Sequence, residues 1–325
     1  MKARPFLASL LAVLLLVLSL GGAGWWLVWQ KSPLQLQHRA LVLPRAARFI
    51  PRDAPLALHL LSDGREPVGY ARAVASARTR RQAAETIERL RDGAFAAAGL
   101  DYPDELAGWL APEISLALFD RPAAGAAPAQ ASAPGTGDWL LALRSRDSGG
   151  ARRFVQRFWQ TRSLAGTDLQ VSSYRGMGLI SGRGALVGRQ PVPLATALID
   201  DDLLLIASGR GVLEEALDVS QLDELNQAAD PSLRAGIERL GPGVALLVAR
   251  DAAALPSLGL SPQSSQRPLA TSDTPPRPLA SPAAADSPAD PAQPRARLLA
   301  SLRPEGRSLR LVESGRGLTA ERALQ

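Results

Sequence analysis

A run of 24 uncharged residues, at positions 6–29, sets the first limit on how this chain can fold. As a helix the run would be about 36 Å long, which is enough to cross the hydrocarbon of a bilayer with some tilt. Trp25, Trp26 and Trp29 lie at its end, where aromatic side chains are typical of a membrane–water interface. The sequence therefore predicts one N-terminal transmembrane helix with these three tryptophans at the membrane interface.

A cleaved signal peptide is the alternative for the same run. Lys2, Arg4, the leucine-rich centre and the small residues at 21–24 are typical of such a peptide. We prefer the anchor because the tryptophans extend the apolar run to membrane length. The basic charges on its two sides are nearly balanced, but a short basic start at 1–5 favours a cytoplasmic N-terminus. We therefore expect a single-pass membrane protein whose soluble domain lies in the periplasm or the thylakoid lumen.

The net charge of +6 comes from the first 52 residues, which contain seven basic residues and no acidic ones. The remaining residues carry 30 basic against 31 acidic side chains, so no general attraction to nucleic acid is expected. The helix predicted at 152–164 alternates arginine with aromatic residues, but their helical spacing is more typical of a packing face. Residues 30–52 contain Pro33, Pro44 and Pro51 and predict a basic, extended stalk.

Strand and helix signals alternate from residue 53 to residue 251. Short apolar runs bounded by turns predict strands at 56–61, 113–119, 138–144, 169–174, 178–181, 195–199, 203–207 and 244–249. Apolar stripes predict helices at 83–97 and 152–164, and proline and acids at 103–105 begin another. Because several strands follow one another directly, we expect an α+β domain, a mainly antiparallel sheet with helices packed on one face.

Two segments have compositions that do not favour a packed core. Residues 121–137 are mostly alanine, proline and glycine and predict a flexible loop within the domain. Residues 252–296 contain ten prolines among 45 residues and predict a disordered segment. Strand patterns at 298–303 and 308–312 then predict a final β-hairpin within 297–325.

No catalytic signature is present in the sequence. The chain has no cysteine and only two histidines, so neither a thiolate nor a multi-histidine metal site is expected. Asp200, Asp201 and Asp202 could bind a cation, but an acidic hairpin turn explains them more simply. A serine triad would have to use His59, which lies in a strand that looks buried. We therefore predict no catalytic, cofactor-binding or metal-binding residues and no cofactor.

Several short motifs resemble a known family. Residues 49–55 read Phe-Ile-Pro-Arg-Asp-Ala-Pro before a strand, residues 99–102 read Gly-Leu-Asp-Tyr, and residues 301–309 read Ser-Leu-Arg-Pro-Glu-Gly-Arg-Ser-Leu. Together with Trp109-Leu110 and Glu113-Ile114, and in their order along the chain, these motifs resemble a cyanobacterial membrane-anchored family called domain of unknown function 3352. The resemblance implies an N-terminal anchor and an exported domain, but no activity and no functional residues.

Two functions are compatible with these observations. The first is a non-catalytic accessory protein, anchored in a plasma or thylakoid membrane, whose domain binds a protein or a lipid. Its partners would be membrane lipids, through the N-terminal helix, and a membrane protein complex. The second is a membrane-tethered hydrolase with carboxylates that the sequence does not pair. An exposed apolar patch would favour the accessory protein, whereas two acids that face each other in a cleft would favour the hydrolase.

Overall fold

The computed structural model describes residues 32–97, 100–119, 138–164, 166–184, 192–250, 298–305, 308–315 and 318–324. The predicted transmembrane helix with Trp25, Trp26 and Trp29 lies outside these residues, as do the predicted loop at 121–137 and the segment at 252–296. Within the described ranges, no helix combines the length and the apolar character that crossing a bilayer requires.

Strands and helices both contribute to the fold, which confirms the α+β class. The strands are β1 Leu56–Leu60, β2 Leu110–Phe119, β3 Asp138–Ser145, β4 Gln170–Tyr174, β5 Met177–Gly184, β6 Val192–Ile199, β7 Leu203–Ala207, β8 Ala245–Ala249, β9 Leu298–Glu305, β10 Ser308–Gly315 and β11 Leu318–Leu324. The α-helices are α2 Glu66–Val74, α3 Arg80–Ala97, α4 Ser148–Leu164, α5 Arg210–Gln221 and α6 Pro231–Leu240. Shorter helical turns are η1 Pro33–His38, η2 Arg45–Phe49, η3 Tyr102–Leu106 and η4 Gln227–Ala229.

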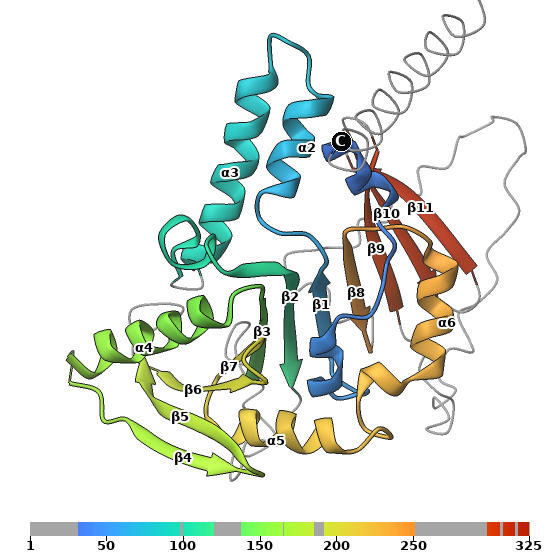
Figure 1. Ribbon diagram of the computed structural model, residues 1–325. Helices are drawn as coiled ribbons and strands as arrows, with labels where there is room; N and C mark the ends of the chain where they lie inside the picture. The colour runs from blue at the N-terminus through green and yellow to red at the C-terminus, as the bar shows by residue number, and fades with distance from the viewer. Residues whose placement is uncertain are drawn as a thin grey trace, which may run out of the picture.

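All eleven strands belong to one antiparallel sheet, in the order β11-β10-β9-β8-β1-β2-β3-β7-β6-β5-β4 (Figure 1). β1 is the fifth strand in this order and pairs with β2 on one side and with β8 on the other. The final hairpin of β9 and β10 is confirmed, and β11 adds a further strand that the sequence analysis did not predict. The antiparallel sheet is therefore as expected.

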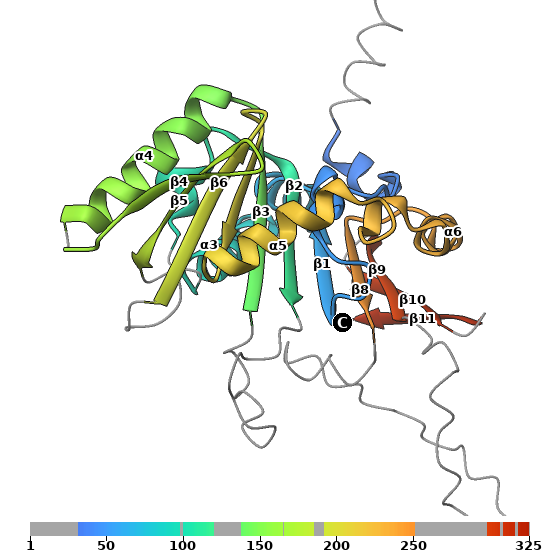
Figure 2. The same ribbon diagram turned by 90° about the horizontal axis from the view of Figure 1, so that it is seen from below.

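Helices cover both faces of this sheet, so the prediction of helices on one face is wrong. Figure 1 shows α4 above and α5 below the part of the sheet formed by β4 to β7. Figure 2, turned by 90°, shows α6 beside α5. The helices belong to two separate hydrophobic cores on opposite faces of the sheet. α5 and α6 pack on the face that carries Ala117 and Leu205, whereas α4 packs on the face that carries Leu143 and Ile206. All five residues of β7 are buried, and a strand that is apolar on both sides needs a cover on each.

The predicted packing face of α4 is confirmed. Phe154, Phe158 and Trp159 are buried, and the indole N–H of Trp159 donates a hydrogen bond to the Thr196 hydroxyl at 2.7 Å. The indole ring of Trp109 lies 5.3 Å from the ring of Phe154, measured between centroids. These aromatic side chains therefore form the core under α4 and are not available to nucleic acid.

Residues 32–52 pack on the domain, which differs from the stalk that their prolines predicted. Pro33 begins η1 and Pro44 precedes η2, so both prolines start helical turns. Phe49 and Ile50 are buried in the core that contains α5. The Ile50 carbonyl also accepts a hydrogen bond from the Gln227 amide at 3.0 Å. Apolar residues between the basic ones therefore fix this segment to the sheet.

Candidate binding groove

α2 and α3 form a helical hairpin that stands beyond the ends of β1 and β2 (Figure 1). The chain leaves β1 through the turn at residues 62–64, runs up α2 and down α3, and returns to the sheet through η3. Tight packing at the base of the hairpin requires a glycine: a Cβ at Gly64 would lie 2.5 Å from the ring of Tyr102. The hairpin therefore meets the sheet at its base only, and a groove remains beside it.

The groove has a volume of about 500 Å³, within the usual range for a ligand-binding pocket. One wall comes from α2 and α3, and the other from η1 and four strands, β1, β2, β8 and β9. Its main apolar residues are Leu36, Leu60, Pro67, Tyr70, Ala71, Val74, Ile87, Leu90, Phe95, Ile114, Val244, Ala245, Leu302 and Pro304. Leu90 is 66% exposed and therefore lies at the rim of the groove.

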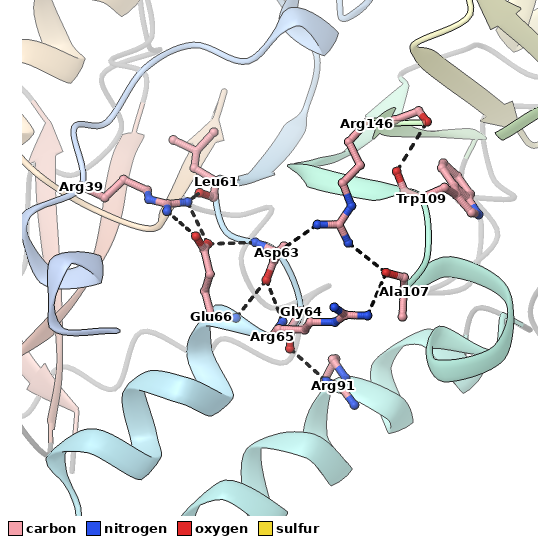
Figure 3. Close-up of polar contacts among 11 residues, drawn as sticks. Arg39, Leu61, Asp63, Gly64, Arg65, Glu66, Arg91, Ala107, Trp109 and Arg146 are labelled. Carbon is pink, nitrogen blue, oxygen red and sulfur yellow. Dashed lines mark hydrogen bonds and ion pairs between the residues drawn. The ribbon is translucent and has the colours of Figure 1, made fainter. Parts of the chain in front are cut away.

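A polar network, drawn in Figure 3, lies at the end of the groove that Asp63, Gly64 and Arg91 line, which we call its base. The Asp63 carboxylate accepts hydrogen bonds from the backbone amides of Arg65 and Glu66 at 2.8 and 2.9 Å. The Glu66 carboxylate accepts in return from the Asp63 amide at 3.1 Å, so reciprocal bonds join the turn to the first residue of α2. Arg39 donates to Glu66 at 2.8 Å and also to the Leu61 carbonyl, and thereby connects the segment after η1 to α2.

Three further arginines connect the turn at residues 62–64 to its neighbours. Arg65 and Arg146 both donate to the Ala107 carbonyl, at 3.2 and 2.9 Å, and Arg146 lies 3.8 Å from the Asp63 carboxylate. Arg91 donates to the Gly64 carbonyl at 3.0 Å, and its guanidinium carbon lies 4.2 Å from the centre of the Tyr102 ring. The base of the groove is therefore held by charge-assisted bonds from four separate parts of the chain.

His59 belongs to a separate, enclosed polar cluster on the other face of the sheet. Its Nδ1 lies 2.8 Å from the Ser115 hydroxyl, and its Nε2 lies 3.3 Å from the Gln227 side-chain oxygen. Burial lowers the pKa of His59 to about 4, although the hydrogen bond with Gln227 raises it. His59 and Gln227 are fully buried and Ser115 is 1% exposed, so a substrate cannot reach this serine and histidine.

The acidic sequence at 200–202 forms the expected hairpin turn. Asp200 and Asp201 have φ angles of 45° and 62°, the positive values that both central residues of a type I′ turn require. Their carboxylates form ion pairs with arginines: Asp200 and Asp202 with Arg45, and Asp201 with Arg152. In the described part of the chain, no cluster of three or more histidine or acidic side chains could hold a metal ion.

The sequence analysis did not find the groove. The available signal was the apolar stripe that predicted the helix at 83–97, on which Ile87 and Leu90 lie. The opposite wall comes from Leu36, Val244 and Leu302, which are far from α3 in the sequence and give no local sign of their proximity.

Comparison with protein families gives a match over most of the chain. The family model described as "Protein of unknown function (DUF3352)" matches residues 10–275. Neither the curated proteins nor the solved structures contain a significant match.

Proposed function

The chain belongs to the DUF3352 family of proteins of unknown function, and we propose that it is a membrane-anchored accessory protein whose domain binds an apolar partner without catalysis. The groove between the α2–α3 hairpin and the sheet is the observation that carries this proposal. It combines a ligand-sized volume, an apolar lining and a hydrogen-bonded polar base, which are the usual properties of a preformed binding site.

The proposed anchor is the uncharged run at 6–29, and the family match begins within that run, at residue 10. The basic start at 1–5 favours an exported domain, in the periplasm or the thylakoid lumen. η1 begins at Pro33, a few residues after the run, and its Leu36 lines the groove. The proposed anchor and the proposed site are therefore close along the chain.

The hydrolase alternative has no comparable support. His59 and Ser115 are hydrogen-bonded to each other, but both are enclosed in the core. A reaction there would require the sheet and η4 to separate. Binding at the open groove needs no such change, so we propose binding and not hydrolysis.

The absence of cysteine from the chain allows a direct test. The variant Leu90→Cys would place the only thiol of the full-length protein at the rim of the groove. After labelling with a benzophenone maleimide and illumination in native membranes, we expect a crosslinked adduct of the groove's occupant, identified by mass spectrometry.

Leu164→Cys is the matched control because Leu164 is another exposed leucine, at the end of α4 and 83% exposed. We expect the yield of adduct at position 90 to exceed that at position 164 at least fivefold. Equal yields and equal products at the two positions would refute the groove as a binding site.

A further inference from the structure

We propose that the groove holds one acyl chain of a phospholipid from the membrane in which the protein is anchored. This inference rests on the proposed function and names the class of its ligand. It follows from the lining of the groove, from its position near the N-terminal segment and from the charges at its base.

The lining favours a hydrocarbon chain over a peptide. The charged or hydroxyl-bearing residues of the lining are Ser62, Asp63, Tyr70 and Arg91. Of these, Asp63 and Arg91 already form hydrogen bonds within the polar base. An extended peptide would bring backbone amides and carbonyls that need partners, and their burial without partners is costly. A helix is 10–12 Å across, so about 500 Å³ would hold little more than one turn of it. An acyl chain has no polar groups to satisfy.

With the proposed anchor at 6–29 in a bilayer, the groove would lie near the membrane surface. η1 packs on α2, where a Cβ at Gly69 would lie 3.7 Å from Pro33. Three residues separate Trp29 from Pro33, and an extended chain spans at most about 3.5 Å per residue. With Trp29 at the membrane interface, the wall of the groove at Leu36 would therefore lie within about 25 Å of the lipid head groups. A lipid could reach the groove with its head still near the surface.

The charges at the base of the groove suit an anionic head group. The groups there are four guanidiniums and three carboxylates, from Arg39, Arg65, Arg91, Arg146, Asp63, Glu66 and Asp92. Of these groups, Asp63 and Arg91 line the groove itself. Arg65, which is exposed, and Arg146, whose side chain is 42% exposed, lie beside Asp63 just outside it, where they would meet a phosphate that extends from this end of the groove. Guanidinium groups bind phosphate with paired hydrogen bonds. The acyl chain would then lie along Ile87 and Leu90.

The test uses the full-length protein in vesicles of phosphatidylcholine and phosphatidylglycerol. A small fraction of the lipid carries a photoactivatable diazirine in the middle of one acyl chain. After illumination and proteolysis, we expect labelled peptides from α2, α3 or β9 in addition to the N-terminal segment. Ala71→Trp, which fills the groove, and Leu90→Arg, which places a charge at its rim, should each lower the groove label at least tenfold.

Leu164→Arg is the matched control for the charge and should change the groove label less than twofold. Thermal unfolding of each variant shows whether it is folded. Because the two groove variants act by different means, one still tests the proposal if the other does not fold. Competition by lysophospholipids should improve about fourfold with each added methylene until the groove is filled, and should then stop improving. This plateau would distinguish a groove of fixed size from partition into the bilayer.

The outcomes separate the two proposals. Label confined to residues 1–31, or groove label that neither variant lowers, would overturn the lipid inference. If the benzophenone at position 90 then captures a protein, the proposed function stands with a different partner. If position 90 captures nothing above the control at position 164, both proposals fail.

Discussion

Protonation of His59 should make the domain less stable in acid, by an amount that one substitution can isolate. The imidazole is fully buried between two neutral partners, the Ser115 hydroxyl and the Gln227 side chain. Burial disfavours the charged imidazolium, and this lowers the pKa of His59 from its ordinary value of 6.5 to about 4. In the unfolded chain the same group would titrate near 6.5.

The sign follows from proton binding. Between pH 6.5 and pH 4 the unfolded chain binds a proton at His59 and the folded chain does not, so stability falls as the pH falls. Above pH 6.5 both states are neutral and the effect disappears. A pKa lowered from 6.5 to about 4 corresponds to about 3 kcal/mol of unfolding free energy at pH 4. For a domain of this size, that is a shift of roughly 6–12 °C in Tm.

The measurement is thermal unfolding of the full-length protein in a nonionic detergent between pH 4 and pH 7, followed by tryptophan fluorescence. His59→Gln removes the titrating group and leaves a polar side chain that can still bond to Ser115. Acidic side chains also titrate in this range, but they do so in both proteins. The stability of wild type relative to His59→Gln should therefore fall by about 3 kcal/mol from pH 7 to pH 4.

His38 provides the matched control, because it is the other histidine of the chain and lies exposed on η1. His38→Gln should follow the wild-type profile. A constant difference between wild type and His59→Gln across the whole pH range would refute the reasoning, since it would mean that His59 is accessible to water or already paired with a charge.

Three further predictions concern packing, capping and topology. Gly150→Ala should destabilise the domain by about 1–3 kcal/mol because the added Cβ would lie 2.4 Å from the Cβ of Trp109. Gly93→Ala on α3, where no atom lies within 4 Å of the added Cβ, should stabilise the domain by up to about 1 kcal/mol. Thermal unfolding compares the two variants, and equal effects would contradict the packing argument. Asp230→Ala removes the side chain that accepts from the amides of Ser232 and Leu233 at the start of α6, and should cost about 1–2 kcal/mol in urea unfolding, with Asp230→Asn costing less. A reporter that is active only outside the cytoplasm, fused after Gln325, should be active, while a reporter that needs the cytoplasm should not; the opposite result would contradict the proposed export.

Local patterns in the sequence predicted elements well. β7 and the packing face of α4 follow directly from the apolar runs and spacing that define them. The start of α6 also had a local signal that the sequence analysis did not use: Asp230 caps the helix and Pro231 occupies its first turn. The continuous apolar run of β7 likewise indicated that both faces of the sheet needed a cover.

Long-range features were not predictable in this way. The pairing of Leu56 in β1 with Ala249 in β8 joins residues almost two hundred positions apart, and no local pattern specifies it. The same is true of the groove, whose walls come together only because η1, β8 and β9 lie beside the α2–α3 hairpin. The misassigned stalk has a related cause: Phe49 and Ile50 resemble scattered apolar residues until α5 is placed against them.

The open groove is a consequence of how the α2–α3 hairpin is fixed. Burial of Ile87 and Leu90 against the sheet would contribute about 1.5–3 kcal/mol for each side chain, so an unconstrained hairpin would close. It stays open because its base is fixed at Gly64, where Tyr102 leaves no space for a side chain, and by the bond from Arg91 to the Gly64 carbonyl. Closure would require these contacts to break, together with the hydrogen bond from the Glu66 amide to the Asp63 carboxylate. The fold therefore keeps apolar surface exposed at a stability cost, and such a cost is typical of a site that is occupied in the functioning protein.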